Sequence, residues 1–253
     1  MILDSFKLQG KNALVTGSSR GLGAAIAVAF GEAGANVALH GSQRIPEEVV
    51  QRVARTGVRH IELIADLRNP ENVPSLIERT VEAFGSIDIL VNNAGMIKRA
   101  PAAETPLSDW LMVLQTNLTS AFQLSQAAGR HMLAQGSGKI INVASLLAFQ
   151  GGILVPAYSA AKGGLSQLTK ALANEWAAKG INVNAIAPGY MDTDNTEALR
   201  NDPVRSRQVM ERIPAGRWGR PEDIAGAAVY LASPASSFVH GHVLAVDGGW
   251  LAR

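Results

Sequence analysis

The chain has 253 residues, of which 47% are hydrophobic and 17% charged, and its formal net charge is +2. The apolar content is enough for one large core. The basic residues are scattered, which argues against nucleic-acid binding although the pI is about 9.0. The absence of cysteine excludes disulfides, thiolate nucleophiles and cysteine-ligated metals. The histidines lack metal-ligand spacing, and the N-terminus lacks the apolar run of a secretory signal. We therefore expect a cytoplasmic protein with no metal site and no membrane partner.

An apolar strand at residues 12–16 is followed by a glycine-rich loop that opens a helix reaching about residue 33. The loop GSSRGLG has the spacing G-x-x-x-G-x-G. Between a strand and a helix, such a loop directs free backbone N–H groups and the positive helix end at an anion, commonly a pyrophosphate. We predict a dinucleotide-binding loop formed by Gly17, Ser19, Arg20, Gly21, Leu22 and Gly23.

The same loop also satisfies the G-x-S-x-G motif of serine hydrolases, with Ser19 at the nucleophile position and His240 or His242 later in the chain. A hydrolase elbow needs earlier strands, because its oxyanion hole takes an N–H from a preceding loop. Only one short strand precedes this loop, so the hydrolase is the weaker interpretation.

The second strand, residues 36–40, ends at His40 and is followed by the loop Gly41–Arg44. In dinucleotide-binding folds the residue at this position meets the adenosine ribose, where an acidic side chain suits the 2′-hydroxyl of NAD. This segment has no acid. Arg20, Ser42 and Arg44 could surround a 2′-phosphate instead, unless the two arginines are ordinary surface residues. The pattern favours NADP(H) over NAD(H).

Strands and helices continue to alternate. A strand at 61–66 ends in Asp66, which could accept a hydrogen bond from an adenine amino group or simply cap a turn, and Leu67 follows it. A helix from Asn69–Pro70 to about residue 84, a strand at 87–91 and the segment Asn92–Gly95 follow. A long helix then runs from about residue 106 to 133 and carries Asn117 near its middle.

Ser145, Tyr158 and Lys162 form the candidate reaction centre. Tyr158 and Lys162 stand four residues apart in a helical pattern, so both side chains lie on one helix face, as they also could in a helix without any catalytic role. An ammonium about 5 Å from the phenol would favour the phenolate by about 3 kcal/mol and lower the tyrosine pKa by about two units. Ser145, at the end of the strand 139–144, can present a hydroxyl to the same substrate oxygen.

The last third contains a strand at 181–187, a polar segment at about 188–213, a helix at 221–232 and a strand at 243–246. The polar segment is predicted to be an irregular, mobile lid over a pocket. The alternation of strands and helices without repeat or linker predicts one domain, residues 1–253. Its fold class is α/β, a Rossmann-type doubly wound parallel sheet of about seven strands.

Taken together in order, the glycine loop, Asp66, the NNAG segment, Asn117, Ser145, Tyr158-x-x-x-Lys162 and Pro188-Gly189…Thr193 resemble the short-chain dehydrogenase/reductase family over essentially the whole chain. The resemblance implies that Tyr158 exchanges the proton, Ser145 orients the substrate oxygen, Lys162 lowers the tyrosine pKa, and Asn117 holds a relay water. It also implies cofactor contacts beyond the glycine loop, at Asp66, Leu67, Asn92, Asn93, Ala94, Gly95, Tyr158, Lys162, Pro188, Gly189, Met191 and Thr193.

Further segments, among them FQGGI, NVNAIAPGYMDTDN, PAGRWG and VDGGWLAR, resemble the bacterial 2-dehydro-3-deoxy-D-gluconate 5-dehydrogenases, a group also described as 2-deoxy-D-gluconate 3-dehydrogenases. This implies a sugar-acid substrate such as 2-keto-3-deoxygluconate. Lys98, Arg99 or Arg217 could meet its carboxylate, and Gln150 is a further candidate substrate contact. That group is generally NAD-linked, whereas the loops of this chain favour NADP.

Two other interpretations remain open besides the hydrolase: a 3-oxoacyl or general carbonyl reductase of the same family, and a dinucleotide-binding module without catalysis. Members of the family are commonly homotetramers. The resemblance therefore implies a homotetramer, with the last strand and Trp250 at a subunit interface.

Overall fold

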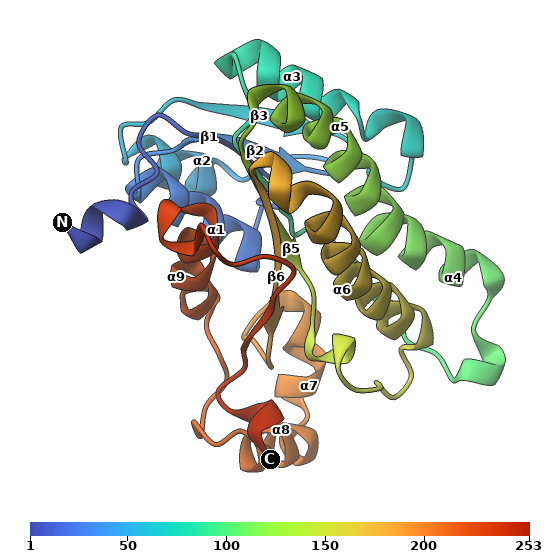
Figure 1. Ribbon diagram of the computed structural model, residues 1–253. Coiled ribbons are helices and arrows are strands. Elements are labelled where there is room, and N and C mark those ends of the chain that lie inside the picture. The colour runs from blue at the N-terminus through green and yellow to red at the C-terminus, as the bar shows by residue number, and fades with distance from the viewer.

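Short apolar segments along the chain form a central sheet of seven parallel strands (Figure 1). The computed structural model describes all residues, 1–253. The strands are β1 (Asn12–Val15), β2 (Asn36–Gly41), β3 (His60–Ile64), β4 (Ile89–Asn92), β5 (Gly138–Val143), β6 (Ile181–Pro188) and β7 (Val243–Val246). Their order is β3-β2-β1-β4-β5-β6-β7, and every neighbouring pair is parallel. The predicted doubly wound α/β sheet is confirmed.

Nine α-helices accompany the sheet. They are α1 (Gly21–Glu32), α2 (Glu47–Ala54), α3 (Ser75–Phe84), α4 (Leu107–Leu114), α5 (Ser120–Gln135), α6 (Pro156–Trp176), α7 (Glu197–Asn201), α8 (Pro203–Arg212) and α9 (Pro221–Ala232). No helix is both long enough and apolar enough to cross a membrane.

Both faces of the sheet are buried, which explains why the strands are continuously apolar rather than alternating. Along β1, Ala13 and Val15 face one core, with α1, α2 and α9, while Leu14 faces the other, with α3, α5 and α6. The large side chains Phe30 and Trp176 are buried on opposite faces. The helices therefore form two layers, one on each face of the sheet (Figure 1).

The chain winds in one direction from β1 to β3 and in the other from β4 to β7, so the order of the strands reverses between β1 and β4. In open parallel sheets, ligands bind outside the carboxyl ends of the strands at such a reversal. The loops after β1, β2, β4, β5 and β6 all emerge at this edge.

The structure differs from the sequence-based expectation in three segments. The helix expected from Asn69 is a short 3₁₀ turn, Pro70–Asn72, before α3, although Asn69 does cap it by accepting a bond from the Glu71 N–H. The long helix carrying Asn117 is interrupted by a π turn at Gln115–Thr119, a rare conformation that is frequent at functional sites.

The third difference is the segment 188–213, which was expected to be irregular but contains α7 and α8. The carboxylate of Asp202 accepts hydrogen bonds from the N–H groups of Val204 and Arg205, and Pro203 occupies the first turn of α8. An acidic N-cap followed by proline is a strong helix-start signal, and it outweighs the polarity of this segment. We call residues 188–213 the lid segment below.

Candidate active site

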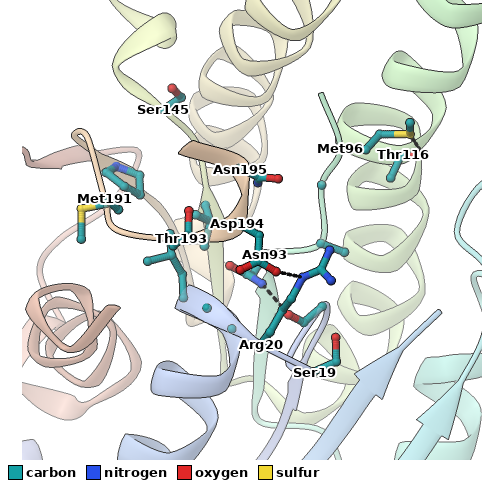
Figure 2. A pocket seen from close by; sticks show the side chains of 18 of the residues that line it. Ser19, Arg20, Asn93, Met96, Thr116, Ser145, Met191, Thr193, Asp194 and Asn195 are labelled. Carbon is teal, nitrogen blue, oxygen red and sulfur yellow. Dashed lines mark hydrogen bonds and ion pairs between the residues drawn. The ribbon is translucent and has the colours of Figure 1, made fainter. Parts of the chain in front are cut away.

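A cavity of about 510 Å³ lies at the carboxyl edge of the sheet, beside the reversal between β1 and β4. It brings together twenty of the residues predicted from the sequence: Gly17, Ser19, Arg20, Gly21, Leu22, Gly23, His40, Ser42, Asp66, Leu67, Asn93, Ala94, Gly95, Ser145, Tyr158, Lys162, Pro188, Gly189, Met191 and Thr193. Ser19 and Ser145 lie at opposite ends of it (Figure 2). Arg44, Asn117, Lys98, Arg99 and Gln150 are not among its lining residues.

The glycine loop requires glycine for two different reasons. Gly17 and Gly21 have φ angles of +64° and +54°, in the left-handed region that other residues rarely adopt. At Gly23 a Cβ atom would lie 2.3 Å from the carbonyl oxygen of Gly17, so only glycine lets α1 pack this closely on the loop. No side chain caps the N-terminus of α1, so its first N–H groups remain available to a ligand. This cradle fits the pyrophosphate of a dinucleotide.

Thr16 and Asn93 join the glycine loop to the loop after β4. The Thr16 hydroxyl accepts hydrogen bonds from the N–H groups of Asn93 and Ala94, each 3.0 Å long. The Asn93 amide donates to the carbonyl oxygens of Thr16 at 2.8 Å and Gly17 at 3.1 Å. The two walls of the cavity are thus held together by hydrogen bonds to the backbone.

Asn92 was expected on the adenosine side, but its side chain points away from the cavity into the core. Its amide nitrogen donates to Asn142 at 2.8 Å and to Ser125 at 3.0 Å. Asn92 is the last residue of β4 and is 4% exposed, whereas Asn93 lies in the loop that follows and lines the cavity.

His40 supports the glycine loop from the end of β2. Its Nδ1 accepts a hydrogen bond from the Gly17 N–H at 3.1 Å, and its Nε2 lies 3.0 Å from the carbonyl oxygen of Ala65. This pair of contacts fits the neutral imidazole with its proton on Nε2. The ring is 2% exposed, and burial lowers the pKa of His40, while the bond to Ala65 acts in the opposite direction. His40 therefore joins three loops of the cavity, a role that the sequence did not indicate.

Asp66, which lines the cavity after β3, is paired with a neighbour that was not predicted. The Arg68 guanidinium lies 2.6 Å from the Asp66 carboxylate, and this contact lowers the pKa of Asp66. Arg68 also lines the cavity, as does Ser42, whereas Arg44 is exposed and does not.

Arg20 extends from the glycine loop toward the lid segment, where its Nε lies 3.1 Å from an oxygen of Asp194 (Figure 2). The two side chains are 74% and 66% exposed, so solvent screens this ion pair. Near it, a Cβ atom on Gly21 would lie 3.5 Å from the Thr193 side chain. The glycine loop and the lid segment therefore face each other across the cavity entrance.

Ser145, Tyr158 and Lys162 meet at the other end of the cavity. Lys162 is 3% exposed, its Nζ donates to the Val143 carbonyl oxygen at 2.6 Å, and it lies 5.5 Å from the Tyr158 ring centroid. Burial lowers the pKa of Lys162 to about 8. Burial also raises the pKa of Tyr158 to about 12, against a hydrogen bond with Ser145 and the positive charge of Arg99.

These pKa values correct the electrostatic argument made from the sequence. The predicted lowering by Lys162 counted only the attraction between two charges, whereas in the folded chain the cost of burying the phenolate is larger. Without a ligand, Tyr158 is a neutral phenol near pH 7.

Asn117 lies behind the cavity rather than in it. It is 1% exposed, and its amide nitrogen donates to the Met96 and Val113 carbonyl oxygens, each at 2.9 Å. Its Oδ1 accepts from the Met96 N–H at 3.2 Å. Asn117, which lies in the π turn, thereby holds the main chain of Met96, the residue that follows Gly95. A relay water would have to be held by the second lone pair of Oδ1 or by the main chain.

The candidate substrate contacts are engaged elsewhere in the chain. Lys98 lies 3.8 Å from Asp109, and Arg217 forms a paired contact with Asp223 at 2.6 and 2.9 Å. Gln150 accepts a hydrogen bond from the Trp250 indole at 3.3 Å. Only Arg99 is directed at the cavity walls: it donates to the Asn195 carbonyl oxygen at 3.0 Å, and its charge acts on Tyr158.

Besides Arg68, the unpredicted lining residues are Met96, Thr116, Val143, Ala144, Asp194, Asn195 and Thr196. Several directly follow or precede predicted residues, as Met96 follows Gly95 and Asp194 follows Thr193. The sequence signal for these residues was their position next to predicted loop residues. The predicted loop segments were too short to include them.

The hydrolase interpretation is excluded by topology. Ser19 follows the carboxyl end of β1, whereas His240 and His242 precede the amino end of the parallel strand β7, at the opposite edge of the sheet. His240 and the His242 N–H contact Asn182 and Asn184, respectively. Neither histidine can reach Ser19.

Comparison with known proteins agrees with this geometry. Residues 17–251 match the family adh_short_C2, described as enoyl-(acyl carrier protein) reductase. The chain is 52% identical over 255 residues to 2-dehydro-3-deoxy-D-gluconate 5-dehydrogenase of Escherichia coli K12, with 100% of both chains covered. It is 52% identical over 252 residues to the enzyme of that name from Bacillus subtilis 168, covering 99% of this chain and 98% of the relative.

Solved structures give the same result. One from Agrobacterium tumefaciens, described as a 2-deoxy-D-gluconate 3-dehydrogenase with bound NADP, is 53% identical and has a TM-score of 0.92, covering 98% and 99% of the two chains. A gluconate 5-dehydrogenase from Burkholderia cenocepacia, in complex with NADP and tartrate, is 39% identical with a TM-score of 0.94 and full coverage of both chains. The chain belongs to the short-chain dehydrogenase/reductase family.

Proposed function

We propose that the protein is an NAD(P)-dependent oxidoreductase that interconverts a secondary alcohol and a ketone on a sugar acid, with 2-keto-3-deoxygluconate or a deoxygluconate as substrate. The observation that carries this proposal is the placement of Ser145, Tyr158 and Lys162 at one end of a cavity whose other end is a dinucleotide cradle. The names of the relatives supply the substrate class.

When bound, the nicotinamide ring donates or accepts a hydride at the carbinol carbon. The Tyr158 hydroxyl gives a proton to the substrate oxygen during ketone reduction and takes it back during alcohol oxidation. Ser145 shares a hydrogen bond with Tyr158 and can hold the same oxygen in line. The pKa of about 12 keeps the phenol protonated, which suits the reductive direction. For oxidation, Lys162 must help to favour the phenolate.

The cofactor preference proposed is NADP(H) over NAD(H). Arg20 and Ser42 lie at the adenosine end of the cavity, and no acidic residue follows β2 there. A guanidinium binds phosphate by charge-assisted hydrogen bonds. Two related structures contain NADP, which is compatible with this assignment.

Arg99 is the residue proposed to recognise the substrate carboxylate. Its charge reaches Tyr158, so a carboxylate held by Arg99 would belong to the molecule whose oxygen meets the phenol. The Burkholderia relative was solved with tartrate, itself a hydroxy acid. Lys98 and Arg217 are weaker candidates, because each already faces a carboxylate of this chain.

We further propose that the lid segment moves when substrate binds, and that the protein acts in the cytoplasm as a homotetramer. The expectation that Trp250 lies at a subunit interface is not retained, because Trp250 is 4% exposed within a single chain and needs no partner to be buried. The edge strand β7 is only partly buried and remains the candidate for such a contact.

The decisive experiment measures kcat/KM for uronate-derived ketones, 5-ketogluconate, a 3-oxoacyl thioester and simple ketones, each with NADPH and NADH. We expect turnover of the sugar acids, with NADPH preferred. Preference for the thioester or for uncharged ketones would replace the sugar-acid assignment with a general carbonyl reductase. A clear NADH preference would overturn the cofactor assignment, and no turnover of any substrate would favour a binding module.

A further inference from the structure

The C-terminal tail, residues 247–253, is folded by hydrogen bonds within itself and is attached to the segment at Ala215. The Asp247 carboxylate accepts hydrogen bonds from the Gly249 and Leu251 N–H groups, both at 2.9 Å. The Ala215 N–H donates to the Gly248 carbonyl oxygen at 3.0 Å. Within this tail, the Trp250 side chain is 4% exposed.

The Trp250 indole contacts three segments that are distant in the sequence. Its Nε1 donates to the Gln150 side chain at 3.3 Å. Its ring centroid lies 4.5 Å from that of Tyr190, and the Arg212 guanidinium carbon lies over the ring, 4.1 Å from its centroid. Gln150 belongs to the loop that starts at Ser145, Tyr190 to the start of the lid segment, and Arg212 to the end of α8.

Arg253 adds a second attachment at the end of α8. Its Nε donates to the Arg212 carbonyl oxygen at 3.2 Å, and its guanidinium also donates to the Glu211 carbonyl oxygen. Carbonyl groups in the last turn of a helix have no partner within the helix, and a cation there is favourable. Leu146, Val209, Ile213 and Trp250 complete a small apolar cluster separate from the two cores of the sheet.

Trp250 therefore lies between the loop that carries Ser145 and the lid segment. We propose that Trp250 is a positioning residue that sets the spacing between the Ser145–Gln150 loop and α8, and so shapes the substrate end of the cavity rather than the dinucleotide end. None of its contacts reaches the glycine loop or His40. The bond to Trp250 also gives Gln150 a role other than the substrate contact expected from the sequence. This inference rests on the proposed function for the location of the substrate.

The test compares Trp250→Phe, which keeps an aromatic ring but loses Nε1 and the larger area of the indole, with Trp176→Phe as a matched control. Trp176 is also buried, at 7% exposure against 4% for Trp250, and its Nε1 donates to Glu175 at 3.1 Å, but it lies at the end of α6. We expect Trp250→Phe to raise the KM for the sugar acid by about threefold to tenfold, as loss of one hydrogen bond implies. The Kd for NADPH should stay at the wild-type value, and Trp176→Phe should change neither.

Two further variants isolate the bond. Gln150→Leu should reproduce the part of the KM increase that is due to the hydrogen bond, and the double variant should be no worse than Trp250→Phe alone, because the bond is already lost there. Fully additive effects would overturn the assignment. So would a loss of NADPH affinity equal to the loss in KM, because Trp250 would then stabilise the whole cavity.

Hydrogen exchange gives a readout without substrate. Trp250→Phe should accelerate exchange in residues 145–152 and 203–212 together, and Trp176→Phe in neither segment. Wild-type exchange rates in both segments would overturn the proposal. Because this measurement uses no sugar acid, an enzyme inactive toward sugar acids would contradict the proposed function while the exchange rates still decided the role of Trp250.

Discussion

The two ends of the cavity are built in different ways. At the dinucleotide end, the glycine loop is held by contacts to backbone atoms: Thr16, His40 and Asn93 all bond main-chain groups of neighbouring loops. At the substrate end, the loop after Ser145 and the lid segment meet mainly through packed side chains, in the Trp250 cluster and in the bond from Trp250 to Gln150, with one bond to the main chain from Arg99 to Asn195. The glycine spacing of the first end is local in the sequence, but its supporting bonds join residues 23 to 77 positions apart. The supporting bonds of the second end join segments about 100 residues apart.

This difference determines which substitutions each end should tolerate. Where the glycine loop is closely packed against backbone atoms, an added atom has no room, so substitutions there should weaken cofactor binding. A wall of side chains can be repacked without altering the sheet, so changes there should alter substrate binding and turnover.

The largest effect is expected from Tyr158→Phe. The substitution removes the proton carrier and leaves the ring, so kcat should fall about 10²- to 10⁴-fold, the usual contribution of general acid–base catalysis. The Kd for NADPH should hardly change, because the glycine loop is untouched. Steady-state kinetics and cofactor titration check both statements, and wild-type turnover would rule out the proposed mechanism.

Gly23→Ala tests whether the close packing of the glycine loop is needed for cofactor binding. The added Cβ would lie 2.3 Å from the Gly17 carbonyl oxygen, so the loop must move. Overpacking of this kind costs about 1–3 kcal/mol, and we expect NADPH affinity to fall about tenfold or more. Gly226→Ala in α9 is the control, because nothing lies within 4 Å of its Cβ position. Equal NADPH affinity in both variants would show that the loop adapts.

The sequence predicted the two ends unequally well. All the strands and the glycine-loop residues were anticipated, because apolar runs and glycine spacing are local signals of a parallel sheet and its loops. The ion pair between Arg20 and Asp194, the bond between Gln150 and Trp250, and the support of the loop by His40 depend on how distant segments meet, which spacing does not encode. The raised pKa of Tyr158 was missed for a related reason: the sequence gives the distance to Lys162 but not the burial.

Arg20→Ala sharpens the cofactor assignment. Loss of a charged hydrogen bond to the 2′-phosphate should lower kcat/KM with NADPH about 10- to 100-fold and leave the value with NADH nearly unchanged. Arg44→Ala should have little effect with either cofactor, because Arg44 is exposed and does not line the cavity. Equal losses with both cofactors would place Arg20 at the pyrophosphate instead.

His40 should make the stability of the dinucleotide end depend on pH. Its pKa in the folded chain is lowered from 6.5, so its contribution is complete above pH 6.5 and is lost as the pH falls toward the folded-state pKa. We expect His40→Gln to reduce the loss of Tm between pH 7.5 and 5.5, because glutamine can accept and donate without being protonated. An unchanged loss of Tm would contradict a buried neutral His40.

The smallest effect is expected where the two ends meet, at the exposed pair between Arg20 and Asp194. Asp194→Asn removes the carboxylate that competes with a 2′-phosphate for Arg20, so the KM for NADPH should fall, although by less than about fivefold because exposed ion pairs are weak. In the Arg20→Ala background the same substitution should change nothing. A similar gain in both backgrounds would mean that Asp194 acts by general repulsion of the cofactor and that Arg20 does not couple the lid segment to the dinucleotide end.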